Sequence, residues 1–162
     1  MIQRIQSLFL LVAAIIPIVL LFIPIGFVNT DEAQYLFNSI VLKFNTPGGT
    51  AVLRLYYVAF CLVLCSALSI IALLGYKNRV RQVQTVSITM IVFLVTLLLM
   101  LWICPDIIFK KFFASRQLDY EFVFVHKVIL IILFAIEAAC LYFANKFIKK
   151  DEALVRAADR LR

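Results

Sequence analysis

Residues 5–30 read IQSLFLLVAAIIPIVLLFIPIGFVNT and carry no charged side chain. Such a run either crosses a bilayer, whose hydrocarbon core of about 30 Å needs roughly 20 helical residues, or lies inside a very large protein core. A chain of 162 residues provides no such core. The run is longer than the apolar region of a secretory signal and no convincing cleavage site follows it, so we expect an uncleaved anchor. Pro17 and Pro24 predict a kink, or a helix end near Ile23.

Three further apolar stretches follow along the chain. Leu55–Tyr76 and Gln82–Pro105 are uncharged, whereas the stretch over residues 122–147 is interrupted by His126, Lys127 and Glu137. With 65% hydrophobic and 15% charged residues, the composition excludes an ordinary soluble domain, in which these shares are roughly 45–50% and 25%. We predict an all-α membrane protein, a four-transmembrane-helix bundle in a single domain over residues 1–162. The spans are expected at about 5–28, 52–76, 82–105 and 122–147.

The distribution of Lys and Arg predicts the orientation, because cytoplasmic loops carry an excess of these residues. Four crossings place ten of them on the side of the chain ends: Arg4, Lys77, Arg79, Arg81, Lys146, Lys149, Lys150, Arg156, Arg160 and Arg162. The other side carries at most six: Lys43, Arg54, Lys110, Lys111, Arg116 and Lys127. We therefore expect both termini in the cytoplasm. The net charge of +7 then reflects topology rather than nucleic-acid binding.

Both outer loops contain signals for local structure. In the loop from Asn29 to Thr50, Thr30 and Asp31 resemble a helix cap and a Pro-Gly-Gly turn follows at Pro47, which predicts a short helix and then a small hairpin. In the second loop, apolar side chains fall on one helical face, which predicts a short outer helix lying at the membrane interface. Its aromatic residues either anchor the ends of the spans or form a docking surface for a partner: Trp102, Phe109, Phe112 and Phe113.

Glu137 is the most informative residue, since an acidic side chain near the centre of a span costs about 2.5–3.5 kcal/mol on insertion scales unless it is paired or neutral. His126 shares its helical stripe but lies about 16 Å away along the axis, too far for a hydrogen bond. Hydroxyl groups at a similar depth are Ser66, Ser69, Thr89 and Thr96. Two interpretations stay open: a structural polar seam between the second, third and fourth spans, or a proton- or substrate-linked site.

The sequence predicts no cofactor and no metal. It has one His and four Cys without a metal-ligand spacing, and Cys61, Cys65, Cys104 and Cys140 are expected to be buried packing residues. Phosphate-binding loops and nucleophile motifs are absent from the sequence. We therefore expect no enzymatic activity, although a membrane-bound redox enzyme acting through these thiols is a third interpretation.

The tail over residues 148–162 is rich in helix formers and lacks Gly and Pro, so a cytoplasmic amphipathic helix is expected there. Its role is either that of a basic surface anchor or that of a docking helix for a cytoplasmic partner. The docking candidates are Leu154, Arg156, Ala158, Asp159, Arg160, Leu161 and Arg162.

The two ends of the chain carry a family resemblance. Met1-Ile2-Gln3-Arg4-Ile5-Gln6 runs straight into the first span, and the chain closes with Lys150-Asp151-Glu152-Ala153-Leu154-Val155-Arg156 followed by Ala158-Asp159-Arg160-Leu161-Arg162. In these motifs the chain resembles the short four-span inner-membrane proteins of Bacteroidetes that are known only as a domain of unknown function. The resemblance implies a bacterial inner-membrane location, and it supplies no activity, cofactor or catalytic residue.

Two functions are consistent with these features. The first is an accessory or scaffold subunit of a larger membrane complex, whose partners are the lipid bilayer and another protein. The alternative is a small proton-coupled transporter or channel-like oligomer centred on Glu137. The sequence leaves the oligomeric state open, because it contains no close-packing motif that compels a homo-oligomer.

Overall fold

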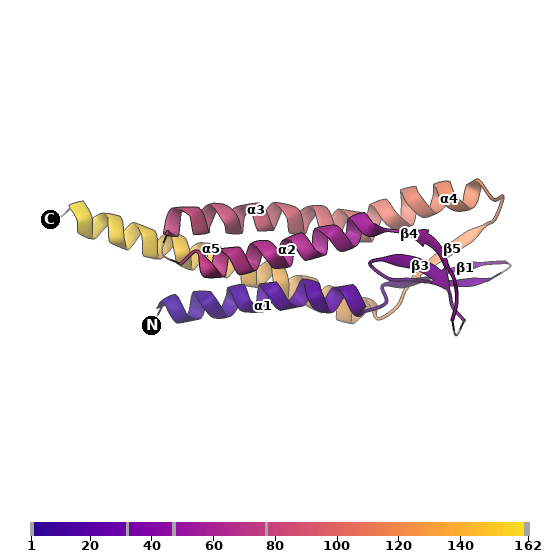
Figure 1. Ribbon diagram of the computed structural model, residues 1–162, viewed down its shortest axis with the longest axis horizontal. Coiled ribbons are helices and arrows are strands. Elements are labelled where there is room, and N and C mark those ends of the chain that lie inside the picture. Colours follow the sequence, from indigo (N-terminus) through magenta and orange to yellow (C-terminus); the bar gives the residue numbers. More distant parts are fainter. Residues whose placement is uncertain (1, 32, 47, 77, 161–162) are drawn as a thin grey trace.

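Four helices are built from the four apolar stretches, and they lie side by side with both chain ends at the end of the bundle opposite a small sheet (Figure 1). The computed structural model describes residues 2–31, 33–46, 48–76 and 78–160. Each long helix has a neighbour on two sides, since α1 and α3 both pack against α2 and α5. These helices are α1 (Ile2–Phe22), α2 (Tyr56–Leu74), α3 (Arg79–Leu98) and α5 (Lys127–Arg160).

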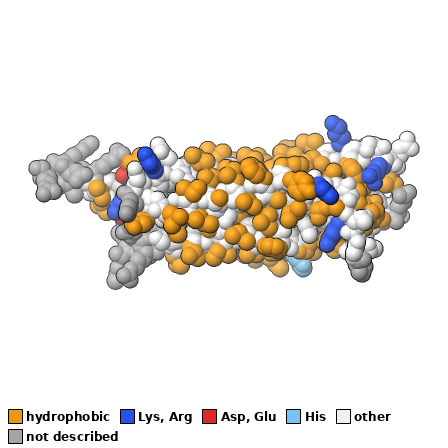
Figure 2. Space-filling view, in the orientation of Figure 1, with side chains coloured by type: hydrophobic (Ala, Val, Ile, Leu, Met, Phe, Trp, Pro, Cys, Tyr) orange, Lys and Arg blue, Asp and Glu red, His pale blue; other side chains and the backbone are white. Residues whose placement is uncertain are grey.

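The outer surface of the bundle is apolar. Figure 2 shows hydrophobic side chains covering its middle, with the visible Lys and Arg side chains towards the two ends. Large side chains such as Leu8, Phe60 and Ile91 are exposed. Soluble monomers rarely expose an apolar belt of this extent, and lipid is its natural solvent. Among the described residues, four helices are long and apolar enough to cross a membrane, as the sequence predicts.

The first helix ends where the prolines predict. In a longer helix, residue 24 would donate its N–H to the carbonyl of Leu20, but Pro24 has no N–H, and α1 ends at Phe22. The buried hydroxyl of Ser39, which follows β2 (Gln34–Phe37), donates to the Leu20 carbonyl instead, at 2.8 Å. Ser39 therefore ties the end of α1 to the loop that follows it.

Replacement of Ser39 by alanine is expected to lower the free energy of unfolding by about 1–3 kcal/mol, because it leaves the buried Leu20 carbonyl without a donor. Thermal unfolding in detergent measures this change. The matched control is Ser115→Ala, since the Ser115 hydroxyl also donates to a carbonyl, that of Phe112, but at an exposed position. Equal losses in the two variants would contradict the role given to Ser39.

The third helix does not end at Pro105. It continues from α3 without a break through the π-helical segment η1 (Leu99–Phe109) into α4 (Lys110–Ala114). Pro105 lies inside the π-helical segment, and the wider turn accommodates a residue that cannot donate its own hydrogen bond. The prediction of a separate interfacial helix in the second outer loop is therefore wrong.

The all-α class is also wrong, because the two outer loops form a five-stranded antiparallel sheet of order β4-β3-β2-β1-β5. Besides β2, its strands are β1 (Gly26–Thr30), β3 (Val41–Phe44), β4 (Ala51–Arg54) and β5 (Tyr120–Phe124). The first loop supplies four strands and the second supplies β5, which pairs with β1. Residues at the edges of the expected first, second and fourth spans thus form strands rather than membrane helix.

The helix expected at Thr30 and Asp31 is absent from the described part of this loop. The Thr30 hydroxyl donates to the carbonyl of Ala33 at 2.8 Å and accepts from its N–H at 3.2 Å. These bonds close a tight turn between β1 and β2 instead of capping a helix. Of the expected hairpin, β3 and β4 are present, while its central Pro47 lies outside the described residues.

An aromatic cluster joins the sheet to the long third helix. Phe37 of β2 meets Phe109 of η1 edge to face at 5.0 Å between ring centroids. The Phe113 ring of α4 lies 5.5 Å from that of Tyr35 and 5.4 Å from that of Tyr120. The extended helix is thus the surface on which the sheet packs.

Candidate functional site

Glu137 lies on α5, which packs against α1 and α3, and its side chain is fully buried. Neither carboxyl oxygen has a hydrogen-bond partner within the described part of the chain. Buried polar groups are ordinarily paired, because an unpaired one loses the hydrogen bonds that water would make. A buried carboxyl group with no hydrogen-bond partner among the described residues is therefore an unusual chemical feature of this helix bundle.

The α2 face beside this site is also polar. Ser66 donates to the carbonyl of Ala14 at 2.8 Å and so joins α2 to α1. The buried Ser69 hydroxyl, like the Glu137 carboxyl, has no partner among the described residues. Cys65 lies one turn before Ser69, and its thiol is 3.9 Å from the Thr96 hydroxyl on α3. This contact joins α2 to α3.

The hydroxyl groups on α3 bond mainly within their own helix. Thr89 donates to the carbonyl of Thr85 at 2.9 Å and Thr96 to that of Val92 at 2.8 Å. No hydrogen bond in the described part of the chain connects Glu137 to Ser69, Thr89 or Thr96. In the described part of the chain, the expected seam is therefore not a hydrogen-bonded network.

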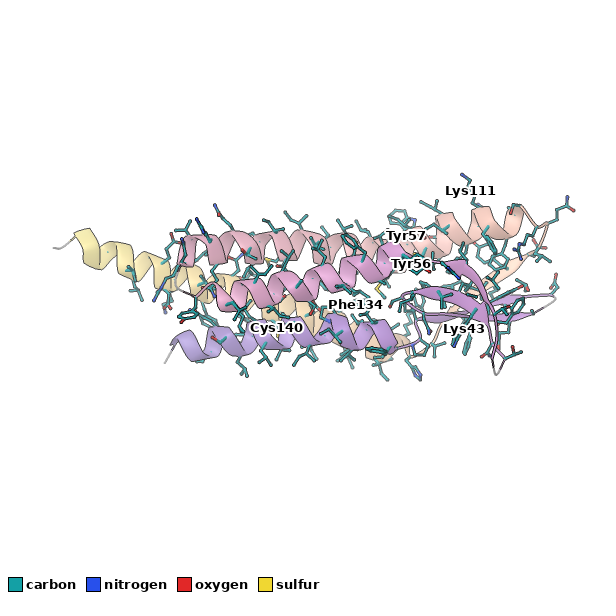
Figure 3. All side chains as sticks on the ribbon, in the orientation of Figure 1. Lys43, Tyr56, Tyr57, Lys111, Phe134 and Cys140 are labelled. Carbon is teal, nitrogen blue, oxygen red and sulfur yellow. The ribbon has the colours of Figure 1, made fainter. Side chains whose placement is uncertain are left out.

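Two thiols lie near the carboxyl group, and the sequence led us to expect both as buried packing residues, with a redox role as the other interpretation. Glu137 interacts electrostatically with Cys65 of α2 and with Cys140, which follows it by one turn on α5. Figure 3 labels Cys140, together with Phe134 on the same helix nearer the sheet. Cys65 lies four positions before Ser69 and therefore on the same face of the helix. This spacing in the sequence indicates that the thiol belongs to the polar face.

His126 lies away from this cluster, at the junction of β5 and α5. Its side chain is exposed, its φ is 53°, and its carbonyl accepts the N–H of Leu130 at 3.0 Å. A positive φ is uncommon for a residue other than glycine and marks a sharp change of chain direction. His126 thus starts the helix, and it does not reach Glu137.

The outer aromatic residues divide into two groups. Trp102 is 62% exposed on the apolar belt, whereas Phe109 and Phe113 are fully buried against the sheet. Phe112 is half-buried, and the Arg116 guanidinium group lies 4.4 Å from the centre of its ring. Of the predicted outer residues, only Trp102 is thus largely exposed, as a lipid-facing residue must be.

Tyr120 fixes β5 to the π-helical segment. Its hydroxyl donates to the carbonyl of Pro105 at 3.0 Å. Burial raises the pKa of the Tyr120 phenol, and the nearby Asp106 carboxylate raises it further. The phenol therefore keeps its proton and remains a donor to the Pro105 carbonyl.

Asp151 marks the point at which α5 leaves the bundle. Its carboxylate accepts a hydrogen bond from Gln6 of α1 at 3.0 Å and forms an ion pair with Arg79 of α3 at 3.3 Å. Beyond this junction α5 continues to Arg160 and projects past the other helices (Figure 1). Leu154 and Val155 are 56% and 44% exposed there.

The structure places some of the predicted docking residues of the tail and not others. Arg156, Ala158, Asp159 and Arg160 lie on α5, while Leu161 and Arg162 lie outside the described residues. Over residues 2–31, 33–46, 48–76 and 78–160, no group of three or more His, Cys, Asp or Glu side chains is arranged to hold a metal ion. The four cysteines are free thiols.

Comparison with known proteins gives a family match over nearly the whole chain. No curated protein and no solved structure matches this sequence. A family model described as "Domain of unknown function (DUF4293)" matches residues 2–161. The chain therefore belongs to this family of proteins of unknown function.

Proposed function

We propose that this protein is a non-enzymatic accessory or scaffold subunit of a larger membrane complex. The projecting end of α5 carries this proposal, because it exposes Leu154 and Val155 beyond the Asp151 junction. Apolar side chains on a helix that leaves its own bundle favour a protein partner at that end of the membrane. The sheet at the opposite end offers a second surface for a partner.

A photo-activated crosslinker at position 154 tests this proposal in native membranes. We expect one defined protein to be captured from position 154. The same protein should no longer copurify in mild detergent with a chain that ends after Glu152, which keeps the Asp151 contacts. A crosslinker at Lys149, which is exposed but precedes the junction, is the control. A chain that stays alone in mild detergent, or a truncation that leaves cells unaffected, argues against the proposal.

We propose the inner membrane of a bacterium as the location, with both chain ends in the cytoplasm. The two ends lie at the same end of the bundle (Figure 1), and the ten Lys and Arg residues assigned to that side support this orientation. A single Cys introduced at exposed Ala157 should resist a membrane-impermeant thiol reagent in intact cells, whereas one at exposed Thr50 should react. The reverse pattern would overturn the orientation.

A second candidate function rests on Glu137. A fully buried carboxyl group without a described partner is the kind of group that proton-coupled transporters use, and oligomerisation would add the pathway that four helices leave little room for. Within the described residues, no chain of hydrogen bonds leads from Glu137 to the hydroxyl groups of α2 and α3. The buried carboxyl group itself is therefore the observation that supports this candidate.

A further inference from the structure

A hollow of about 260 Å³ lies between the third helix and α5, next to β5. Its walls come from η1, β5 and the first two turns of α5. The lining side chains are Leu101, Phe124, Lys127, Leu130, Ile131 and Phe134. All are apolar except Lys127, so the hollow is a hydrocarbon groove with one cationic group.

The course of the chain explains why the groove is there. Phe134 of α5 contacts Phe93 of α3, with ring centroids 6.2 Å apart, and this contact closes the end of the groove nearer the bundle centre. Towards the sheet, the chain turns sharply at His126 into α5, while the third helix continues as η1. The two elements thus leave a space that β5 covers through Phe124.

The groove opens to the surface of the apolar belt. Leu101 and Ile131 on its rim are 46% and 57% exposed, whereas Leu130 and Phe134 deeper inside are buried. Phe134 follows Lys127 by seven positions, which is about 10 Å along a helix axis. The groove therefore extends from the edge of the membrane, where a lysine reaches the interface, into the hydrocarbon region.

Lys127 has no ion-pair partner in the described part of the chain. It lies in the first turn of a 34-residue helix that contains no acidic residue in that turn. A helix start favours anions, so an unpaired cation there provides a second attraction for a negatively charged group.

We infer that this groove binds one acyl chain of an anionic phospholipid from the leaflet on the sheet side, with the phosphate beside Lys127. A lipid chain matches this narrow groove better than a helix of a protein partner does, because a helix with its side chains is about 10–12 Å across. This site is independent of the docking role proposed for α5.

Brominated phospholipids, which quench tryptophan fluorescence, test this inference on the full chain reconstituted in vesicles. Trp102 is the only tryptophan, so Trp102→Phe gives a silent background into which Ile131→Trp places a reporter on the groove rim. Vesicles mix phosphatidylcholine and phosphatidylglycerol, with one of the two brominated in each measurement. The ratio of quenching gives the relative affinity of the two lipids at residue 131.

We expect phosphatidylglycerol to be preferred about five-fold at the rim reporter, the effect of one basic residue near an anionic lipid surface. Lys127→Gln should reduce the ratio to about one, and Lys127→Arg should retain it. The matched control is Ile129→Trp, which is also exposed but lies on the opposite face of α5, where the ratio should be about one throughout.

Three results would overturn the inference. Equal affinities of the two lipids at residue 131 would remove the anionic preference, and a preference that survives Lys127→Gln would remove the role of the lysine. Absence of quenching by either lipid at residue 131 would show that protein, either a second copy or another subunit, covers the groove. Lys127 and Ile131 are both exposed, so these substitutions leave the packed core intact.

Discussion

Replacement of Glu137 by leucine is expected to raise the free energy of unfolding in detergent by about 2–3 kcal/mol, because an unpartnered buried carboxyl group is exchanged for an apolar side chain. Thermal unfolding monitored by circular dichroism measures the change. Most substitutions at a fully buried position destabilise a protein, so a gain in stability is a distinctive result. A loss of more than 1 kcal/mol would mean that Glu137 makes a stabilising polar contact in the folded protein.

Glu137→Gln is the matched variant, since it keeps the shape of the side chain and removes its ability to ionise. The docking function predicts that both variants retain the crosslink formed from position 154. The proton-coupled candidate predicts that wild-type protein in vesicles carries a pH-driven flux and that Glu137→Gln abolishes it. A wild-type protein without such a flux, or a glutamine variant that keeps it, contradicts the second candidate.

Replacement of Gly26 by valine is expected to lower the free energy of unfolding by about 3 kcal/mol or more, because a side chain here collides with β5. A Cβ atom at this position would lie 2.5 Å from the Phe122 ring and 2.9 Å from the Val123 carbonyl oxygen. The Phe122 ring also contacts Phe37 and Phe109, so moving it away from residue 26 would disturb these contacts. The substitution should detach β5 from β1 and lower the yield of monodisperse protein.

The control for this substitution is Gly48→Ala. Gly48 has a φ of 78°, but no atom lies within 4 Å of a Cβ atom placed there. Its substitution strains only a turn and should cost about 1 kcal/mol. Size-exclusion profiles and thermal unfolding of the two variants in one detergent compare the effects. Equal behaviour of the two variants would argue against the close contact of β1 and β5.

Hydrophobicity was sufficient to find four helices, because the free energy of burying apolar side chains in lipid depends on composition and length and not on neighbours. The sheet could not be found in this way. Phe27, Val52 and Val123 lie in apolar runs that also read as the ends of membrane spans, and periodicity does not separate a short buried strand from a buried helix turn. Pairing of β1 with β5 joins residues nearly one hundred positions apart, which no local pattern reports.

The polar site shows the same division. Glu137 stands out in the sequence because the energetic penalty for an acidic group in hydrocarbon is a property of that residue alone. Its surroundings are a property of helix packing: the Cys65 thiol near the Thr96 hydroxyl, and the absence of a described hydrogen bond to the carboxyl group. In the same way, the apolar residues of the second loop predicted an amphipathic helix. Phe109 and Phe113 on that helix are covered by the sheet rather than by lipid, and only the folded structure shows this.

The membrane class, the number of spans and the unusual position of Glu137 can thus be predicted from the sequence. Each depends on the free energy of transferring individual side chains out of water. The sheet, the continuous third helix and the groove beside Lys127 arise from contacts between distant segments, and such contacts exist only after the chain has folded.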